Sequence, residues 1–438
     1  MGVVILILMV ILETIFTIYC VRTKSSQPKI RNWLCISEFG SFLLLTIATI
    51  IEWSFRWYLI AFVLFTMAAI ATVRLLTRKL ENKPRKTGRI IAKSLSVILL
   101  LSLTLAPALI FPQYTEPPKT GDYGVATQTY TYTDNERIET FSDSGENRKL
   151  TVQFWYPSDA QGKFPLIVFS HGAFGIRASN TSTYTDLASN GYIVCSIDHP
   201  YHAAGTVDID GKLTIGSPSF MQQVVDINQD LYSEEEKLSI YREWMTLRTD
   251  DISFVLDTIL EKSQAGNDPL FSMIDTGKIG LMGHSLGGAA SVQLGRDRDD
   301  IDAVIDIDGT LLGEERGIVE GEVILTDEPY PLPLLNFYSD YVIKELASQP
   351  DYVYPNKYLT SISPTAYEIC IRGSNHMSYT DLPFFCPLLA DQLSGISGGD
   401  TSSSVDKNYC VQTMNQLILE FFNCYLKGDR TFTPNEYY

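Results

Sequence analysis

Histidine and metal-binding motifs are scarce in this chain. Only five histidines occur among the 438 residues, and they do not combine with the seven cysteines at the spacing of a metal site. The N-terminus, Met1-Gly2-Val3-Val4, lacks the basic residues that begin a signal peptide, and no small-residue cleavage site follows nearby. We therefore predict no metal, no other cofactor and no removable leader.

Long apolar runs are absent after residue 112, whereas four precede it, at residues 3–21, 34–51, 57–73 and 90–111. A helix rises about 1.5 Å per residue, so each run is long enough to cross roughly 30 Å of hydrocarbon. The sequence predicts four transmembrane helices within residues 1–112. A polar, proline-bearing linker at residues 113–121 then leads to a soluble domain at residues 122–438.

Basic residues are scarce in that soluble domain. Residues 1–112 hold 13 of the 34 Lys and Arg residues but only 4 of the 51 Asp and Glu residues, which leaves 21 basic and 47 acidic residues in the rest of the chain. A domain with so much negative charge repels phosphates, and this excludes nucleic acid as a partner.

The positive charges of the membrane part lie in two of its loops. Lys and Arg are frequent in the loop between the first two apolar runs and in the loop between the last two, whereas the middle connection has a single basic residue. Because basic loops remain in the cytoplasm, both loops are predicted to lie inside the cell. We therefore expect a multi-pass protein of the cell membrane whose large C-terminal domain lies on the exterior face.

Two carboxylates interrupt the apolar runs. Glu13 lies in the middle of the first run, and Glu38 lies near the end of a span. An ionisable group within a membrane helix is a functional candidate. No second group at matching depth indicates a relay, however, so we predict no transporter. We interpret each carboxylate as a protonated or paired group that faces the helix bundle.

An odd number of cysteines, five, lies in the soluble part. Cys195 and Cys370 are in apolar, strand-like runs and are predicted to be buried thiols. The sequence leaves open whether two of Cys386, Cys410 and Cys424 form a disulfide, and it does not assign the pairing.

Short apolar segments alternate with helical patterns after the linker, which is typical of an α/β fold. Residues 127–133 and 150–156 alternate like antiparallel strands. Six further segments suit parallel strands buried on both faces: residues 166–170, 192–197, 279–282, 303–307, 334–338 and 367–371. Helices are expected at residues 184–189, 251–261, 286–294, 341–347 and 412–426. Residues 205–249 interrupt the alternation and are predicted to form a lid-like insertion over the carboxyl ends of the strands.

The clearest motif is Gly283-His284-Ser285-Leu286-Gly287, which lies between a predicted strand and a predicted helix. This is the setting of the nucleophile elbow of α/β-hydrolases, in which a sharp turn presents the serine oxygen at the end of the strand. Ser285 is therefore the predicted nucleophile. Small neighbours are needed at such a turn, and the motif supplies them.

A serine that attacks an acyl group also needs two N–H donors for the oxyanion. The N–H of Leu286, directly after the nucleophile, is the first candidate. The second should come from the loop after the third strand, Ser170-His171-Gly172-Ala173-Phe174-Gly175. We predict Ala173, with Phe174 as the alternative.

The general base can be found by elimination. In this fold the chain order is serine, acid, histidine, and four of the five histidines do not follow the serine. Only His376 comes late enough, just after a predicted strand. The sequence offers more than one candidate for the acid that orients this histidine. Asp308 follows the strand after the nucleophile helix, Asp340 follows the next strand, and Asp306 alternates with Asp308 along its strand.

The motifs together resemble those of the platelet-activating-factor acetylhydrolase family. They are WYP at residues 155–157, PLIVFSHGAFG at 165–175, DLASNG at 186–191, GHSLGG at 283–288, Ile307-Asp308-Gly309, and His376. The resemblance covers roughly residues 120–430 and leaves out the apolar runs. It implies an α/β-hydrolase fold, an acid at Asp308 rather than Asp340, and hydrolysis of short or oxidised acyl esters of phospholipids without a metal.

These observations lead to three hypotheses of function. The first is a membrane-anchored, outward-facing serine ester hydrolase with phospholipid or lipid-like substrates. The second is a general small-ester or polyester (cutinase-like) hydrolase with the same residues. The third is a non-catalytic surface receptor with a hydrolase fold, which the presence of both Ser285 and His376 disfavours. The sequence does not predict an oligomeric state.

Overall fold

A computed structural model describes residues 1–77, 80–396 and 403–438. The chain divides into two compact units. The smaller consists of Met1–Thr115 with Phe384–Leu388, and the larger of Glu116–Pro383 with Leu389–Tyr438.

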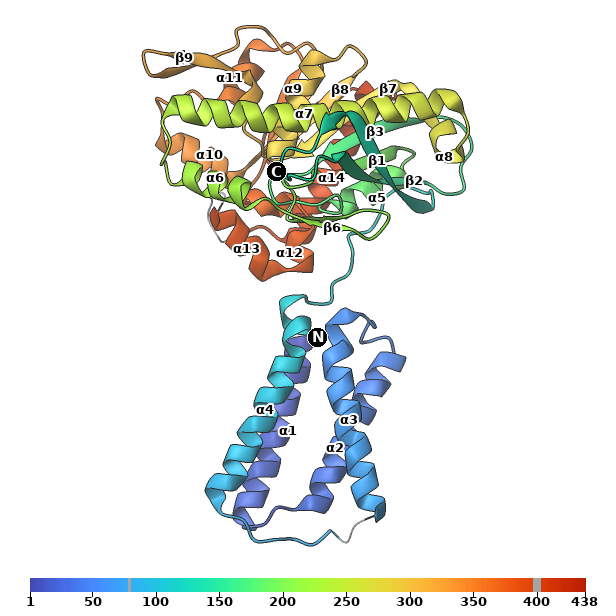
Figure 1. The fold of residues 1–438 in the computed structure, drawn as a ribbon, viewed down its shortest axis with the longest axis vertical. Coiled ribbons are helices and arrows are strands. Elements are labelled where there is room, and N and C mark those ends of the chain that lie inside the picture. Colours follow the sequence, from blue (N-terminus) through green and yellow to red (C-terminus); the bar gives the residue numbers. More distant parts are fainter. Residues whose placement is uncertain (78–79, 397–402) are drawn as a thin grey trace. The chain divides into compact units, whose positions relative to one another are not determined.

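The smaller unit contains four long helices: α1 (Gly2–Arg22), α2 (Pro28–Ile47), α3 (Phe55–Thr77) and α4 (Thr87–Ile110) (Figure 1). Each is long and apolar enough to cross a membrane. Helix α1 packs against α4 and α2 packs against α3, around a core that includes Trp57, Ile60 and Leu64. The outward faces expose large apolar side chains, as helices in contact with lipid do.

The two acidic residues of these helices, Glu13 and Glu38, are buried. Glu13 forms an ion pair with Arg31 of α2. The structure therefore agrees with the interpretation of Glu13 as a paired group that faces the helix bundle.

The larger unit is built on one eight-stranded sheet with the order β1-β2-β4-β3-β7-β8-β11-β12. The strands from β4 to β12 in this order are parallel, and β1 and β2 are antiparallel. The predicted α/β-hydrolase fold is confirmed, and all eight predicted strands are present. Their bounds are β1 Val125–Ile138, β2 Asn147–Pro157, β3 Phe164–Ser170, β4 Ile193–Ile197, β7 Ile274–His284, β8 Ala303–Ile307, β11 Leu334–Ser339 and β12 Ala366–Ile371.

Helices cover both faces of this sheet (Figure 1). Helices α7 (Glu234–Ala265) and α9 (Leu286–Asp297) pack on one face, and their apolar side chains join those of the strands in one core. Helices α5 (Thr181–Ser189) and α14 (Lys407–Tyr425) contribute to a second core on the opposite face. The central strands are therefore buried on both sides, which explains why they are so apolar.

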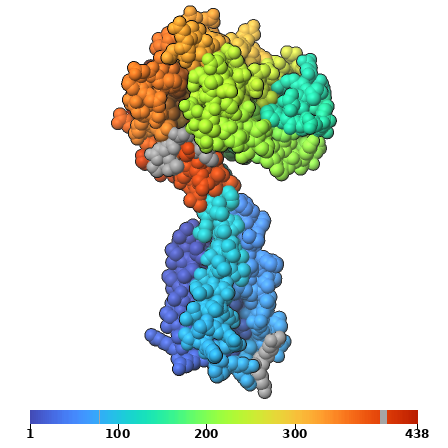
Figure 2. Space-filling model, turned by 60° about the vertical axis from the view of Figure 1, so that its left-hand side comes forward, coloured from blue at the N-terminus to red at the C-terminus, as the bar shows by residue number. Residues whose placement is uncertain are grey.

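Helix α7 is much longer than the helix predicted at residues 251–261. It begins at a capping box, in which Ser233 and Glu236 bond to each other's backbone N–H groups, and it ends at Gly266, whose φ is 65°. The segment 205–249 thus contains the hairpin of β5 (Gly205–Val207) and β6 (Leu213–Ile215), helix α6 (Pro218–Asn228), and the first half of α7. This part of the chain, yellow-green in Figure 2, is prominent on the face shown there.

The remaining elements connect the sheet strands or follow the last of them. Residues 312–325 form a short 3₁₀ helix and a hairpin that the sequence did not indicate. The bounds of these elements are α8 Pro269–Ser272, η1 Leu312–Glu314, β9 Glu315–Val319, β10 Glu322–Leu325, α10 Asp340–Ser348, α11 Pro355–Ile362, η2 His376–Tyr379, α12 Leu382–Phe385 and α13 Pro387–Ile396. All seven cysteines are free thiols, so the structure contains none of the disulfides that the sequence left open.

Candidate active site

Ser285 stands alone between the last residue of β7 and the first residue of α9. Its backbone has φ 55° and ψ −127°, a conformation that a non-glycine residue adopts only when the surrounding structure imposes it. Two sets of hydrogen bonds hold this turn: the Ser285 N–H donates to the carbonyl of Ile307 at 2.8 Å, and the Ser285 carbonyl accepts from the N–H groups of Gly288 and Ala289. The side chain is partly exposed at the carboxyl edge of the sheet.

The turn is tight enough to require glycine on both sides of Ser285. A Cβ atom on Gly283 would lie 2.2 Å from the carbonyl group of Gly287, and a Cβ atom on Gly287 would lie 2.0 Å from the carbonyl oxygen of Ser170. No side chain fits at such distances. The strand, the strained serine and the helix therefore form the nucleophile elbow that the motif predicts.

His376 and Asp308 meet at the same edge of the sheet. Asp308 follows β8, and His376 lies in η2, after β12. The Nδ1 atom of His376 is 2.8 Å from Oδ2 of Asp308, and the other carboxylate oxygen accepts a bond of 2.5 Å from the N–H of Ser339. Both oxygens of Asp308 are thus engaged, and this orients the imidazole ring.

Electrostatics favour an ionised Asp308. Burial by itself would raise the pKa of this carboxyl group, but the hydrogen bond and charge of His376 and the N–H of Ser339 hold its pKa below the ordinary value. A carboxylate only accepts hydrogen bonds, so Nδ1 of His376 carries a proton, and in the neutral ring the lone pair is then on Nε2. This is the tautomer that a general base needs.

The two other acidic residues considered from the sequence, Asp340 and Asp306, have partners other than His376. Asp340 forms an ion pair of 2.8 Å with Lys344, one turn along α10. Asp306 lies within β8, and its Oδ2 accepts from the side-chain amide of Asn356 at 3.1 Å. Burial and the charge of Asp308 raise the pKa of Asp306 well above its ordinary value.

His284 is a contact of His376 that the sequence did not reveal. Its Nε2 donates to the carbonyl oxygen of His376 at 3.0 Å, and the two ring centroids are 4.5 Å apart. Burial, and then the charge of His376, lower the pKa of His284 to about 3, so the ring is a neutral donor. The elbow and the loop that carries the predicted base are therefore joined directly.

The predicted oxyanion loop lies against the nucleophile. A Cβ atom on Gly172 would lie 3.0 Å from the Cβ of Ser285, so only glycine fits here without displacing a neighbour. Among the residues that the structure describes, the N–H groups of Leu286 and Ala173 have no hydrogen-bond acceptor. The N–H of Phe174, the alternative donor, bonds to the carbonyl of His202 at 2.9 Å. These contacts favour Ala173 over Phe174.

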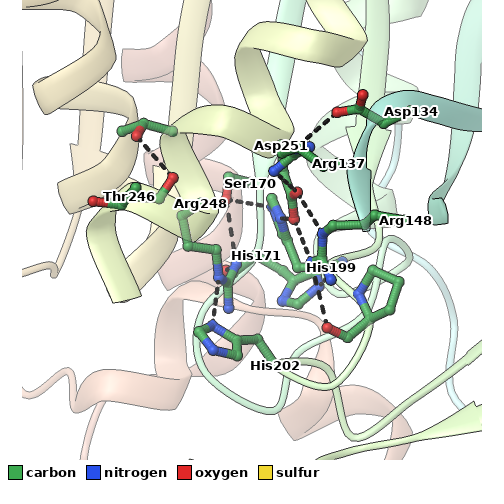
Figure 3. A network of polar contacts seen from close by, with 12 residues as sticks. Asp134, Arg137, Arg148, Ser170, His171, His199, His202, Thr246, Arg248 and Asp251 are labelled. Carbon is green, nitrogen blue, oxygen red and sulfur yellow. Dashed lines mark hydrogen bonds and ion pairs between the residues drawn. The ribbon is translucent and has the colours of Figure 1, made fainter. Parts of the chain in front are cut away.

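A buried polar network forms hydrogen bonds with this loop (Figure 3). Arg248 of α7 donates to the carbonyl oxygen of His171 at 2.7 Å, and weaker bonds of 3.4 Å reach the Gly172 carbonyl and the Ser170 hydroxyl. His171 itself donates from Nδ1 to the Gly172 carbonyl at 2.7 Å and accepts at Nε2 from the N–H of His199. The carbonyl groups of His171 and Gly172 are therefore held in place by side-chain donors.

The same network contains a second serine–histidine–aspartate chain. The Oγ atom of Ser170 is 2.9 Å from Nε2 of His199, whose Nδ1 is 2.9 Å from Oδ2 of Asp251 (Figure 3). Its geometry is that of a catalytic triad, but all three side chains are essentially inaccessible to solvent. A substrate cannot reach Ser170, and the chain acts as a support.

The charges of the network balance. Asp251 bonds to Arg148 through both oxygens at 2.7 Å, and Arg148 also pairs with Glu139. Arg137 joins Asp251 to Asp134. With Arg248, three cations thus face three carboxylates, which offsets the large penalty for burying charge. Burial nevertheless lowers the pKa of Arg248 to about 9.

Comparisons with known proteins agree with this geometry. The family model described as platelet-activating factor acetylhydrolase, isoform II, matches residues 147–436. The platelet-activating factor acetylhydrolase of Canis lupus familiaris is 26% identical over 278 residues, which are 60% of this chain and 57% of that protein. The protein of the same name from Bos taurus is 24% identical over 284 residues, 62% of this chain and 59% of that protein. The match thus spans less than two thirds of the length of either relative.

The fold also has a solved counterpart. A ferulic acid esterase from Streptomyces cinnamoneus aligns over 73% of this chain and 96% of its own, with a TM-score of 0.56 and 21% identity. At this identity the likeness concerns the fold. The family match extends over both the predicted nucleophile and the predicted base, and it begins after the four apolar helices. The chain belongs to the platelet-activating factor acetylhydrolase, isoform II, family.

Proposed function

We propose that this protein is a membrane-anchored serine carboxylic ester hydrolase that acts on phospholipid or lipid-like esters with short acyl chains. The observation that carries the proposal is the bond between His376 and the ionised Asp308, at the sheet edge where the strained turn presents Ser285. Family membership supports the substrate class.

In the proposed mechanism, Nε2 of His376 takes the proton of Ser285 as its oxygen attacks the ester carbonyl. The negative oxygen of the tetrahedral intermediate is bound by the N–H groups of Leu286 and Ala173. Collapse of the intermediate breaks the ester bond, and His376 donates its proton to the leaving alcohol. A water molecule, deprotonated by the same histidine, then releases the acyl group from Ser285.

The membrane assignment rests on the four apolar helices and on the positions of their charges. In the proposed topology, the two basic loops lie in the cytoplasm and the catalytic domain lies on the exterior face. An anchor of this kind holds the active site beside the membrane, where lipid esters are concentrated.

Fluorophosphonate labelling tests these points together. We expect a membrane-impermeant fluorophosphonate to label intact cells that express the wild-type chain, and Ser285→Ala to abolish labelling. A chain that is labelled only after permeabilisation would contradict the exterior topology, and an unlabelled folded chain would contradict the catalytic assignment. A panel of esters with increasing acyl length then separates the lipid hydrolase from a general or cutinase-like esterase, because only the former prefers a phospholipid to a simple ester with the same acyl group.

A further inference from the structure

A cavity of about 290 Å³ lies in the helical unit, between α1, α2 and α4. It is formed by the second half of α1, the beginning of α2, and the first turns of α4 with the residues just before them. This is the end of the helical unit that carries the basic loops. The size suits a small polar group and excludes a folded peptide.

Positive charge dominates the walls of this cavity. Four cations line it, Arg31, Arg85, Arg89 and Lys93, together with one carboxylate, Glu13. The carboxylate forms an ion pair with Arg31. Within the part of the chain that the structure describes, Arg85, Arg89 and Lys93 form no ion pair, so three positive charges face the cavity without a counterion.

The rim of the cavity is held in place by backbone contacts between the two basic loops. The N–H of Ser26 donates to the carbonyl of Lys83 at 3.2 Å, and the N–H of Arg85 donates to the carbonyl of Lys24 at 3.0 Å. In the wall, the hydroxyl of Thr17 donates to that of Ser94 at 2.6 Å, which joins α1 to α4. These hydrogen bonds join the two loops to each other and α1 to α4. They therefore fix the backbone that carries Arg85, Arg89 and Lys93.

A phosphate group satisfies this arrangement. Its oxygens accept several hydrogen bonds from guanidinium and ammonium groups, and its negative charge offsets the excess positive charge. Basic cavities between membrane helices on the cytoplasmic side are suited to anionic lipid headgroups. Helices α1 and α4 also expose apolar side chains such as Ile15, Ile91 and Leu95, along which acyl chains can lie.

We propose that this cavity binds the phosphate group of an anionic phospholipid from the leaflet on the side of the basic loops. The proposal rests on the membrane placement in the proposed function but not on ester hydrolysis. The lipid is held there as a ligand, because the cavity belongs to the helical unit and contains no predicted catalytic residue.

The test compares two variants with the same loss of charge. Arg89→Gln with Lys93→Gln removes two cations from the cavity. Arg22→Gln with Arg74→Gln removes two exposed cations from the last turns of α1 and α3, which do not line it. Each full-length protein is reconstituted in nanodiscs of phosphatidylglycerol and phosphatidylcholine, and the lipid retained after extraction is counted by native mass spectrometry.

We expect the wild-type chain and the control to retain phosphatidylglycerol in preference to phosphatidylcholine, and the cavity variant to lose this retention about tenfold or more. Equal loss in both variants would show general electrostatic attraction and overturn the proposal, as would no loss in either. A second arm measures the melting temperature in detergent with inorganic phosphate alone. Phosphate-dependent stabilisation that needs Arg89 and Lys93, without selective lipid retention, would assign the site to free phosphate and overturn the lipid source.

Two further measurements, one on membranes of the cells that express the chain and one on the reconstituted chain, separate this proposal from the preceding one. Release of the chain from membranes by alkaline carbonate would defeat the membrane placement on which both rest. Loss of ester hydrolysis with intact lipid retention would defeat the hydrolase assignment alone. The cavity variant is expected to keep its activity toward soluble esters.

Discussion

Arg248 donates a hydrogen bond of 2.7 Å to the carbonyl oxygen of His171, at the beginning of the loop that faces Ser285. The arginine comes from the middle of α7, and the loop follows β3, so the bond links two distant parts of the sequence. An oxyanion donor is useful only if its N–H is already aimed at the developing charge. The N–H of Ala173, the proposed second donor, belongs to the same peptide group as the Gly172 carbonyl, which accepts from His171 at 2.7 Å and from Arg248 at 3.4 Å. We therefore expect Arg248 to help orient this N–H.

Arg248→Lys tests this dependence. Lysine keeps the buried charge but cannot bond to two carbonyls and a hydroxyl in a fixed plane. We expect kcat to fall about 10- to 100-fold with little change in KM, since the loss concerns the transition state. Steady-state kinetics with a soluble ester would measure both constants. Arg242→Lys, on an exposed part of the same helix, is the control. An increase in KM with unchanged kcat would contradict the role in positioning.

Asp308→Asn and Asp340→Asn distinguish the two candidate acids. Asparagine at position 308 can no longer hold the Nδ1 proton of His376, and we expect kcat to fall about 10⁴-fold. At position 340 the exchange removes the negative charge that interacts with Lys344 and with the N–H of Gly373, and activity should stay within about threefold of the wild type. Measurements of kcat for both purified variants decide the matter, and a larger loss at Asp340 would reverse the assignment.

His284→Phe keeps an aromatic ring beside His376 but removes the N–H that bonds to its carbonyl. We expect about a tenfold decrease in kcat, because the loop that carries the base loses one fixed point. His284→Gln restores a donor near the same place and should recover part of the activity. If both variants were equally impaired, the bond to His376 would not be the cause.

The stability of the chain should fall on acidification because of its buried neutral histidines. Burial, and then the charge of Arg248, lower the pKa of His199 to about 3, whereas a histidine in the unfolded chain titrates near 6.5. Between these values the unfolded state binds more protons. The free energy of unfolding therefore decreases as pH falls, by about 1.4 kcal/mol per pH unit for this group. Asp308, whose pKa is also depressed, adds to the loss only below about pH 4.

Melting temperatures of the full-length chain in detergent, at about pH 7 and about pH 5, check this prediction. His199→Gln cannot take up a proton, so the difference between the two temperatures should shrink in this variant even if it is less stable overall. A difference of unchanged size would show that other groups determine the acid sensitivity.

The fold could be predicted in outline because its central strands are buried on both faces. Each of them therefore reads as a short, continuous apolar run, and this pattern is enough to locate it. The length of helix α7 was underestimated because its buried face is not continuously apolar. Its buried face carries Arg248 and Asp251, so the apolar periodicity that identifies a helix is broken where the helix enters the core.

The candidate site was predictable to the extent that chain order determines it. Ser285 has its motif, and His376 is the one histidine late enough in the chain. The residues alone left Asp308 and Asp340 open, since both follow strands, and only the family resemblance favoured Asp308. The network around Asp251 could not be foreseen, because its charged members come from β1, the residue after it, β2 and α7, and they pair only after folding. The bond between His284 and His376 likewise depends on tertiary structure.

The continuity of α7 sets a limit on how this protein can be engineered. Segment 205–249 is the predicted lid-like insertion, and we propose it as the place to exchange residues when another acyl or alcohol group is wanted. Its last part, however, is the same helix that delivers Arg248 to the oxyanion loop and Asp251 to the network. A graft that replaces the whole segment would replace that guanidinium too. A chimaera that ends its foreign sequence before the capping box at Ser233 would exchange the hairpin of β5 and β6 and helix α6, and would keep Arg248 and Asp251.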